Sequence, residues 1–382
     1  MRAFVGFVCV VFLFIISIPL SAQEGPWGQR PRARELGLEL GVLPLGEFNA
    51  ITDVKGVKVG FITIQEEGRF NTGITAILPH GGNLFLEKIP AAIAVGNGFG
   101  KLAGSTQVNE LGEIETPILL TGTLSVPRAA DGLMTYMLGL PGMENVRSIN
   151  PVVGETNDGY LSDIRARPIT AEHVKFAIEQ ATTEPTYYGS LGAGAGTRCF
   201  GFKGGIGTAS RKLPDDMGGW TVGVLVQTNF GGILTIQGKQ IGPMIDEQLK
   251  QRIDAMHDGS IMIVLATDAP LTHRNLQRMA KRTFLGMART GGYASNGSGD
   301  YAIAFSTNEE LRIRSGDDLV TQRPQLGNNA MSLLFLAAVE ATEEAIIDSL
   351  FTSRTTVGPM GTAEELPVEK VLEILAIDRQ EK

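Results

Sequence analysis

One apolar run constrains the fold of this chain more than any other feature. Residues 260–267 read Ser-Ile-Met-Ile-Val-Leu-Ala-Thr, and a polar segment, residues 242–258, comes directly before them. A continuous apolar run of this length is typical of a buried strand. The preceding segment is rich in Asp, Glu, Lys and Gln, so we interpret it as loosely attached. The sequence therefore predicts a boundary at Gly259-Ser260, where a detachable segment ends and a buried strand begins.

A serine at such a boundary has a distinctive chemistry available. Its hydroxyl can attack the preceding carbonyl, which belongs to Gly259 and is sterically open. Hydrolysis of the resulting ester would leave Ser260 as a new N-terminus. The free α-amine has an ordinary pKa of about 7.7–8.0, so a neutral fraction exists near pH 7 and can take the proton of the serine hydroxyl. Ser260 is therefore a candidate nucleophile that needs no separately placed histidine.

The rest of the chain predicts an α/β protein. Apolar or alternating runs bounded by Gly, Pro or Asn predict further strands, at residues 57–64, 73–78, 91–95, 118–121, 220–228 and 301–306. Helical spacing predicts helices at residues 170–183 and 268–288, and a composition rich in Ala, Leu and Glu predicts a long helix at residues 329–350. In the first of these, Thr170 is the expected N-cap and Phe176 is expected on the inner side. Strands and helices mix without a regular βαβ alternation, so we expect a layered sandwich with mixed sheets.

The N-terminal residues are typical of an export signal. A positive start is followed by an apolar stretch, residues 3–16, and by small residues before the polar Gln23. The stretch is short for a membrane span, which disfavours the alternative of an N-terminal anchor helix. We therefore expect residues 1–22 to be removed and residues 23–382 to form a single catalytic domain. The mature protein would be periplasmic or secreted and free of the membrane, with residues 23–50 as a surface arm.

Composition and missing motifs narrow the function. The formal net charge is −8, which argues against a nucleic-acid partner. Four histidines occur without an H-E-x-x-H pattern or a His–Cys cluster, so we expect no zinc site. No G-x-S-x-G motif is present, which weakens a conventional Ser-His-Asp assignment, and His257 is close to Ser260 only in sequence. Cys199 alone remains after signal removal, which excludes a disulfide within the chain.

Two glycine-rich stretches resemble nucleotide-binding loops only in part. Residues 192–197 have a threonine where the third glycine of G-x-G-x-x-G would stand, and residues 201–207 lack the Gly-Lys-Ser/Thr of a phosphate loop. We interpret these glycines as positions of close backbone packing or as the lining of a substrate cleft.

Several longer motifs, in order along the chain, resemble one enzyme family. They lie at residues 49–60, 151–160, 199–211, 226–231, 259–271 and 296–300. Together they are similar to the L-aminopeptidase/D-esterase peptidases of the DmpA type and to the related β-peptidyl aminopeptidases, over nearly all of residues 35–375. The resemblance implies a self-processing N-terminal serine hydrolase with an αββα-type sandwich. It would be built from an α fragment, residues 23–259, and a β fragment, residues 260–382. Its substrates would be small peptides, amides or esters, and the resemblance implies that it uses no metal and no cofactor. Several αβ pairs would assemble as a homo-oligomer.

The resemblance also implies roles for individual residues. Ser260 matches the nucleophile produced by cleavage after Gly259, and Asn229 matches the residue whose amide helps to form the oxyanion hole. Tyr160 matches a tyrosine of the substrate pocket. Ser298 and Asp300 match the serine and the acidic residue that hydrogen-bond around the new amine.

Some alternatives stay open on the sequence alone. Asn229-Phe-Gly and residues 296–300 are also typical of ordinary turns and capping loops. Either Glu155 or Asp158 can be the group that receives the amino group of the substrate. Two other functions compete with the aminopeptidase: a self-cleaving acyltransferase of the ornithine acetyltransferase type, and an exported protein that binds a ligand without catalysis.

Overall fold

The computed structural model describes residues 30–185, 187–246, 258–314, 316 and 319–377. The expected signal segment, residues 1–22, lies outside these ranges, as do His257 and most of the polar segment before Ser260. Within the described residues, no helix is both long enough and apolar enough to cross a membrane.

Two mixed β-sheets form the centre of the molecule. The smaller sheet has the order β1-β2-β5-β6, and the larger has the order β15-β3-β14-β13-β10-β9, with β4 added on β3. The pairs β5–β6 and β13–β14 are parallel, and the remaining pairs are antiparallel. The strands are β1 (Lys58–Glu66), β2 (Phe70–Leu78), β3 (Glu87–Gly98), β4 (Glu113–Ile114), β5 (Ile118–Gly122), β6 (Val152–Thr156), β9 (Ile206–Lys212), β10 (Thr221–Asn229), β13 (Asp258–Thr267), β14 (Gly297–Ser306) and β15 (Ile313–Arg314).

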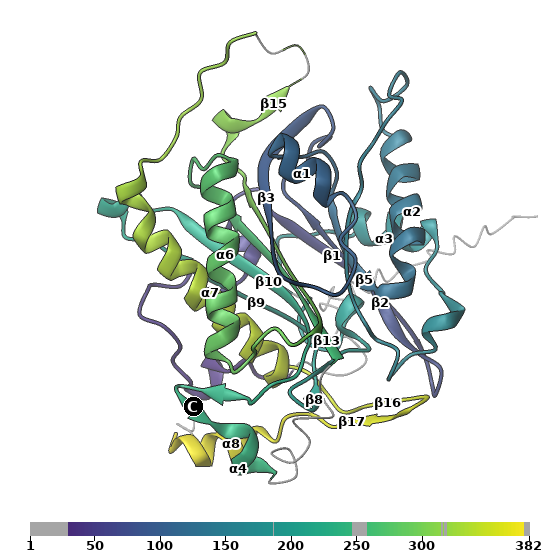
Figure 1. Ribbon diagram of the computed structural model, residues 1–382, viewed down its shortest axis with the longest axis vertical. Coiled ribbons are helices and arrows are strands. Elements are labelled where there is room, and N and C mark those ends of the chain that lie inside the picture. The colour runs from purple at the N-terminus through teal and green to yellow at the C-terminus, as the bar shows by residue number, and fades with distance from the viewer. Residues whose placement is uncertain (1–29, 186, 247–257, 315, 317–318, 378–382) are drawn as a thin grey trace, which may run out of the picture.

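Helices cover the outer face of each sheet (Figure 1). Helices α2 (Val126–Leu138) and α3 (Ala171–Glu179) pack on the smaller sheet, while α6 (His273–Arg289) and α7 (Met331–Phe351) pack on the larger one. Helices and sheets form four layers, and an apolar cluster fills each of the three interfaces between them, one between the sheets and one beneath each pair of helices. This four-layer arrangement confirms the expected αββα sandwich.

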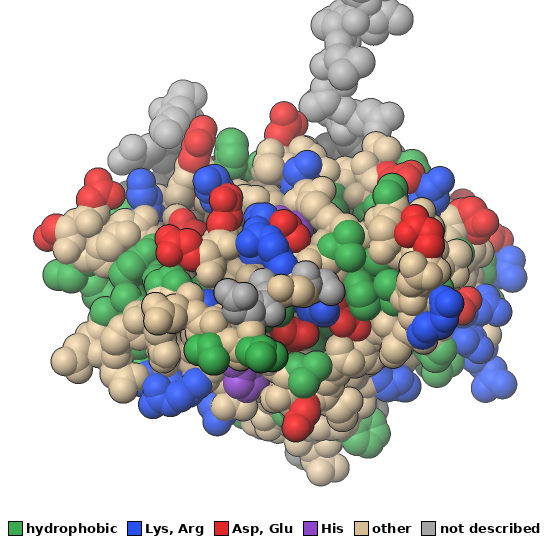
Figure 2. All heavy atoms as spheres, turned by 90° about the horizontal axis from the view of Figure 1, so that it is seen from above, with side chains coloured by type: hydrophobic (Ala, Val, Ile, Leu, Met, Phe, Trp, Pro, Cys, Tyr) green, Lys and Arg blue, Asp and Glu red, His purple; other side chains and the backbone are tan. Residues whose placement is uncertain are grey.

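Shorter elements lie around this sandwich. They are α1 (Ser105–Leu111), α4 (Ile241–Ile245), α8 (Val368–Leu375), and the two-stranded ribbons β7 (Arg198–Cys199) with β8 (Phe202–Lys203), β11 (Thr235–Ile236) with β12 (Lys239–Gln240), and β16 (Thr356–Gly358) with β17 (Gly361–Ala363). On the face shown in Figure 2, acidic and basic side chains are interspersed among apolar ones.

Each predicted element corresponds to an observed one, but several bounds differ, and β6, β9 and α2 are among the elements that were not predicted. The helix expected at residues 268–288 begins only at His273. Helix α3 begins after the N-cap Thr170 as expected, but it ends at Glu179, before residue 183. Phe176 is 49% exposed, so its expected inner position is wrong. The buried residues Val174, Ala177 and Ile178 share one face at helical spacing, and Phe176 lies off that face. Strand β13 begins at Asp258, two residues before the predicted boundary, so the strand runs through the Gly259–Ser260 bond.

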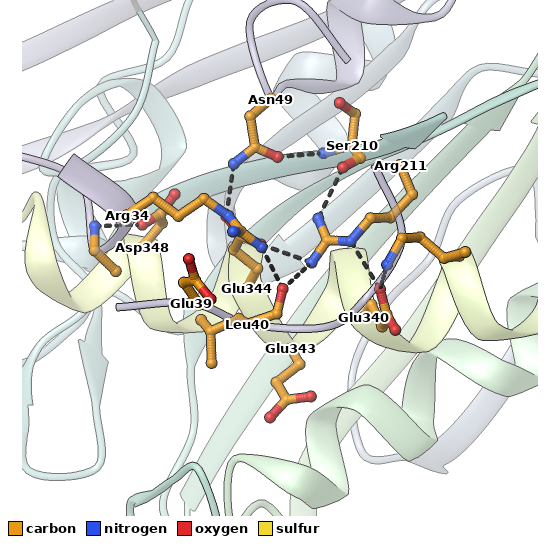
Figure 3. Close-up of polar contacts among 12 residues, drawn as sticks. Arg34, Glu39, Leu40, Asn49, Ser210, Arg211, Glu340, Glu343, Glu344 and Asp348 are labelled. Atoms are coloured by element: carbon orange, nitrogen blue, oxygen red, sulfur yellow. Dashed lines mark hydrogen bonds and ion pairs between the residues drawn. The ribbon is translucent and has the colours of Figure 1, made fainter. Parts of the chain in front are cut away.

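The described part of the predicted N-terminal arm, residues 30–50, is bound to helix α7 by buried ion pairs (Figure 3). Arg211 on β9 is fully buried and donates to Glu340 at 2.9 Å and to Glu344 at 2.7 Å. Arg34 of the arm donates to the other oxygen of Glu344 at 2.7 Å. Burial alone would raise the pKa of Glu344, but the hydrogen bond from Arg34 and the charges of Arg211 and Arg34 outweigh it and hold that pKa below its ordinary value.

We expect Arg211→Met to lower the free energy of unfolding by about 3–5 kcal/mol, because it leaves the buried Glu340 without its ion-pair partner and removes one of the two cations that bind Glu344. Urea unfolding measures the change best in a Ser260→Ala chain, so that a single polypeptide unfolds. Arg69→Met is the matched control: Arg69 pairs with Glu66 at the surface, and the loss of such a pair costs about 0–1 kcal/mol. Equal changes in the two variants would contradict a stabilising role for the buried pairs.

Candidate active site

Ser260 lies near the start of β13, between two neighbouring strands that carry other candidate residues. The antiparallel register places Asn229 of β10 opposite Ser260, and the parallel register places Gly299 of β14 opposite it on the other side. Directly opposed side chains point to the same face of a sheet. Ser260 and Asn229 therefore share the face toward the smaller sheet, and both are nearly buried, at 5% and 8% exposed.

The hydroxyl of Ser260 is beside the carbonyl that it is expected to attack. Its Oγ donates to the carbonyl oxygen of Gly259 at 2.6 Å and accepts a hydrogen bond from the backbone N–H of Gly299 at 3.3 Å. Donation from the Gly299 amide favours the charged form of the hydroxyl oxygen, because it places a partial positive charge against it.

Gly259 is at a position that excludes any side chain. A Cβ atom there would lie 2.6 Å from the Cα of Phe230 and 2.9 Å from the carbonyl oxygen of Asn229. Both neighbours are backbone atoms of the adjoining strand end, so neither can rotate away as a side chain would. A glycine is therefore required for the chain to approach Asn229 so closely.

The side chain of Asn229 is oriented by one hydrogen bond. Its Oδ1 accepts the backbone N–H of Arg198 at 2.9 Å, which assigns the oxygen to that side and directs the Nδ2 donor away from it. Within the described part of the chain, Nδ2 makes no hydrogen bond. A donor left unpaired next to Ser260 is what an oxyanion site requires.

Ser298 and Asp300 lie on the other face of the larger sheet. They flank Gly299 on β14, so the alternation of side chains turns both away from the hydroxyl of Ser260. Ser298 Oγ donates to Asp300 Oδ1 at 2.6 Å, whereas the buried Oδ2 of Asp300 has no partner among the described residues. Burial raises the pKa of Asp300 to about 6, and the Ser298 hydrogen bond opposes this shift. The two side chains therefore do not contact the hydroxyl of Ser260.

Tyr160 is half-buried beside the β16–β17 ribbon. A Cβ atom on Gly361 of that ribbon would lie 2.2 Å from the Tyr160 hydroxyl, so the ribbon contacts the ring closely. The guanidinium carbon of Arg198 lies 3.7 Å from the centroid of the same ring. The backbone N–H of Arg198 also donates to Asn229, at the end of β10. Arg198 therefore contacts both Tyr160 and Asn229.

The two candidate receivers of a substrate amine differ in position. A Cβ atom on Gly100 would lie 3.0 Å from Glu155 Oε1 and 3.4 Å from the Cα of Gly299, so the Glu155 carboxylate lies close to the residue opposite Ser260. Burial raises the pKa of Glu155, and hydrogen bonds from Thr123 and Lys101 oppose the shift. Asp158 instead accepts a hydrogen bond from Thr72 at 2.5 Å, and burial raises its pKa to about 6.

The histidines that the structure describes are engaged elsewhere. His80 and His273 contact the backbone carbonyls of Glu87 and Ala91, and His173 caps helix α3. Among the described residues, no group of three His, Cys, Asp or Glu side chains is arranged to hold a metal ion.

Sequence reasoning missed three residues that support the site. Arg198 orients Asn229, and Asn97 of β3 donates to the carbonyl of Ser298 at 2.5 Å. Lys203 is fully buried and donates to the carbonyls of Gly194 and Gly204, at 2.8 and 2.6 Å, and burial lowers its pKa to about 7. Neither Arg198 nor Asn97 belongs to a sequence motif that would have identified it as a site residue. Lys203 did offer a signal, as a lysine inside a glycine-rich, apolar stretch.

The glycine-rich stretch at residues 192–197 packs against β2. A Cβ atom on Gly196 would lie 2.1 Å from the carbonyl oxygen of Asn71. This contact confirms the interpretation of close backbone packing.

Comparisons with known proteins find sequences and structures that are similar to nearly the whole chain. A model of peptidase family S58 matches residues 49–364. Beta-peptidyl aminopeptidase BapA of Sphingosinicella microcystinivorans is 38% identical over 370 residues, which cover 90% of this chain and 92% of the relative. A Burkholderia sp. beta-aminopeptidase structure has a TM-score of 0.84 at 36% identity, covering 92% of this chain and 100% of that one. The l-aminopeptidase d-ala-esterase/amidase of Ochrobactrum anthropi, described as a prototype serine aminopeptidase and a variant of the Ntn hydrolase fold, has a TM-score of 0.82 at 33% identity, covering 91% and 99%.

Proposed function

The chain belongs to peptidase family S58 and is a serine aminopeptidase with an N-terminal nucleophile; we propose that it is made as a precursor that cuts its own Gly259–Ser260 bond. The observation that carries this proposal is the position of Ser260 Oγ, 2.6 Å from the carbonyl oxygen of Gly259, with the unpaired Asn229 amide on the same face of the sheet. The aminopeptidase assignment takes the place of the acyltransferase and binding-protein alternatives.

In the proposed cleavage, Ser260 Oγ forms a bond to the carbonyl carbon of Gly259 while Asn229 Nδ2 stabilises the developing oxyanion. The carbon–nitrogen bond then breaks, and the hydroxyl proton ends on the departing nitrogen of Ser260. Water hydrolyses the ester, which leaves a carboxylate on Gly259 and a free hydroxyl and amine on Ser260. The products are the α fragment, residues 23–259, and the β fragment, residues 260–382.

Substrate hydrolysis would use the same groups a second time. The neutral amine of Ser260 accepts the hydroxyl proton as Oγ attacks the substrate carbonyl, and it returns the proton to the leaving group. We assign Ser298 and Asp300 to this amine, because Asp300 Oδ2 is buried without a partner and an ammonium would supply one. An ammonium beside Asp300 would also favour the charged carboxylate and lower its pKa from about 6.

The substrate is proposed to be a small peptide, amide or ester with a free amino group. Glu155 is proposed to receive that amine, because its Oε1 and the Cα of Gly299 both lie against Gly100. Asp158 is the second candidate: Thr72 binds its Oδ2, and its buried Oδ1 has no partner among the described residues. Tyr160 is proposed to line the pocket. No metal or cofactor takes part in this scheme.

Two further properties belong to the same proposal. Removal of residues 1–22 would place the enzyme in the periplasm or outside the cell. We also propose that several αβ pairs assemble into a homo-oligomer. Large apolar side chains at the surface are consistent with such contacts, among them Val95, Leu285 and Tyr293, each more than half exposed.

Mass spectrometry of the purified, active protein tests the cleavage directly. We expect two polypeptides, of which the second begins with Ser260 and the first ends with Gly259. Active protein in which this bond is intact would contradict the proposal, whereas a shifted signal-cleavage site would leave it unaffected.

A further inference from the structure

Arg198 presents an unneutralised positive charge at the candidate site. Its backbone N–H donates to Asn229, and its guanidinium lies over the ring of Tyr160. Within the described ranges, the guanidinium itself makes no hydrogen bond and no ion pair with the protein. Arg198 is exposed at the surface. Partial desolvation lowers its pKa, which the nearby Tyr160 hydroxyl opposes, and no carboxylate contributes to the shift.

The stacked geometry leaves the guanidinium able to bind an anion. Stacking on an aromatic ring occupies one face of the planar group, while its N–H donors point outward in that plane. Two parallel donors on one edge match the two oxygens of a carboxylate. Arg198 is therefore held in place by Tyr160 while its donors remain free.

Charge separates the two ends of an aminopeptidase substrate. The N-terminal end carries an ammonium, which a guanidinium would repel and which the Glu155 carboxylate would attract. Glu155 and Gly299 both lie against Gly100, which places Glu155 on the β14 side of Ser260, whereas Arg198 is bound to Asn229 on the β10 side. A cation on the β10 side fits the leaving portion of the substrate, which in a dipeptide carries a carboxylate.

We propose that Arg198 is a specificity-determining residue that binds a carboxylate on the leaving portion of the substrate. In a dipeptide this is the C-terminal carboxylate, and in a longer substrate it can be an acidic side chain. The inference rests on the proposed function of Ser260, Asn229 and Glu155, and it adds the preferred chemistry on the other side of the scissile bond.

The test compares matched substrates in wild-type protein and in Arg198→Met. The probes are L-Ala-L-Ala and β-Ala-L-Ala, each as the free acid and as the C-terminal amide. We expect wild-type kcat/KM to favour the free acids. In Arg198→Met, kcat/KM for the free acids should fall about 10- to 100-fold, mainly through KM, as for a lost hydrogen bond between charged groups. The amides should change by less than about 3-fold, and Arg198→Lys should recover part of the loss, since it restores the charge without the planar fork.

A second pair of probes separates the two sources of the carboxylate. L-Ala-L-Asp amide and L-Ala-L-Asn amide differ only in the charge of the leaving side chain. A loss in Arg198→Met that is confined to the free acids assigns the C-terminal carboxylate, and a loss confined to the Asp amide assigns an acidic side chain. Arg69→Met is the matched control, because Arg69 also stacks on an aromatic ring, that of Phe70. It should leave all ratios unchanged.

Failure of this inference is distinct from failure of the proposed function. Every Arg198 variant keeps the backbone N–H that orients Asn229, so the two fragments should still form. If acids and amides lose activity equally, or if neither loses any, in a protein that is processed and active, the carboxylate role is overturned and the cleavage mechanism stands. An uncleaved wild-type protein that hydrolyses none of the probes would overturn both.

Discussion

The Ser260→Ala variant is expected to remain a single uncleaved chain and to lose aminopeptidase activity by a factor on the order of 10⁴ or more, as when other hydrolases lose their nucleophile. The change removes one oxygen atom and retains Cβ, and the two polar contacts of the hydroxyl are local ones with Gly259 and Gly299. Strand β13 should therefore keep its register between β10 and β14, and the loss should be chemical. Denaturing gel electrophoresis and hydrolysis of an aminoacyl amide measure the two effects.

Ser306→Ala is the matched control for this experiment. Ser306 is fully buried at the far end of β14, where its hydroxyl donates to the carbonyl of Ala269. This variant should be processed and active. Two fragments in the Ser260→Ala protein would mean that another residue, or a contaminating protease, cleaves the chain, and Ser260 would lose its role in processing.

The Asn229→Ala variant is expected to lower kcat about 10²–10³-fold, which corresponds to about 3–4 kcal/mol of transition-state stabilisation. The reason is that Nδ2 is the unpaired donor beside Ser260, whereas Oδ1 serves only to orient the amide through Arg198. Processing should slow as well, because the carbonyl of Gly259 occupies the same position in the precursor. Single-turnover kinetics on fully processed protein, together with a time course of fragment formation, separate these effects.

Asn229→Asp sharpens this prediction. It preserves the shape and the acceptor to Arg198 but replaces the donor with a negative charge, so we expect a loss at least as large as that of Asn229→Ala. Asn275→Ala controls for the removal of a buried amide, since Asn275 lies on α6 and contacts Leu326. A processed Asn229→Ala enzyme with kcat within a few-fold of wild type would exclude an oxyanion role.

Local sequence patterns were enough to predict the main strands and helices that form the layers of the fold. The uninterrupted apolar run before Thr267 predicts the buried strand, the helical spacing within α6 predicts one covering helix, and the Ala/Leu/Glu composition of α7 predicts the other. Composition and periodicity are properties of a short segment. The same locality explains why Phe176 was wrongly assigned to the core. Its hydrophobicity favoured the core, but its place in the helical period does not.

The nucleophile could also be assigned from the sequence, because the chemistry of Gly259-Ser260 depends on two adjacent residues and on the strand that follows them. Only the tertiary structure decided what surrounds it. Asn229 comes to Ser260 through one antiparallel register, Ser298 and Asp300 through one parallel register, and Arg198 through a ribbon folded back on β10. Strand register depends on contacts between segments far apart in the chain, and a shift of one residue would turn each side chain to the opposite face. The assembled sheets therefore decide three properties of the site. Among the described residues, they leave the amide nitrogen of Asn229 unpaired, they bury one oxygen of Asp300 without a partner, and they bring the guanidinium of Arg198 to the site.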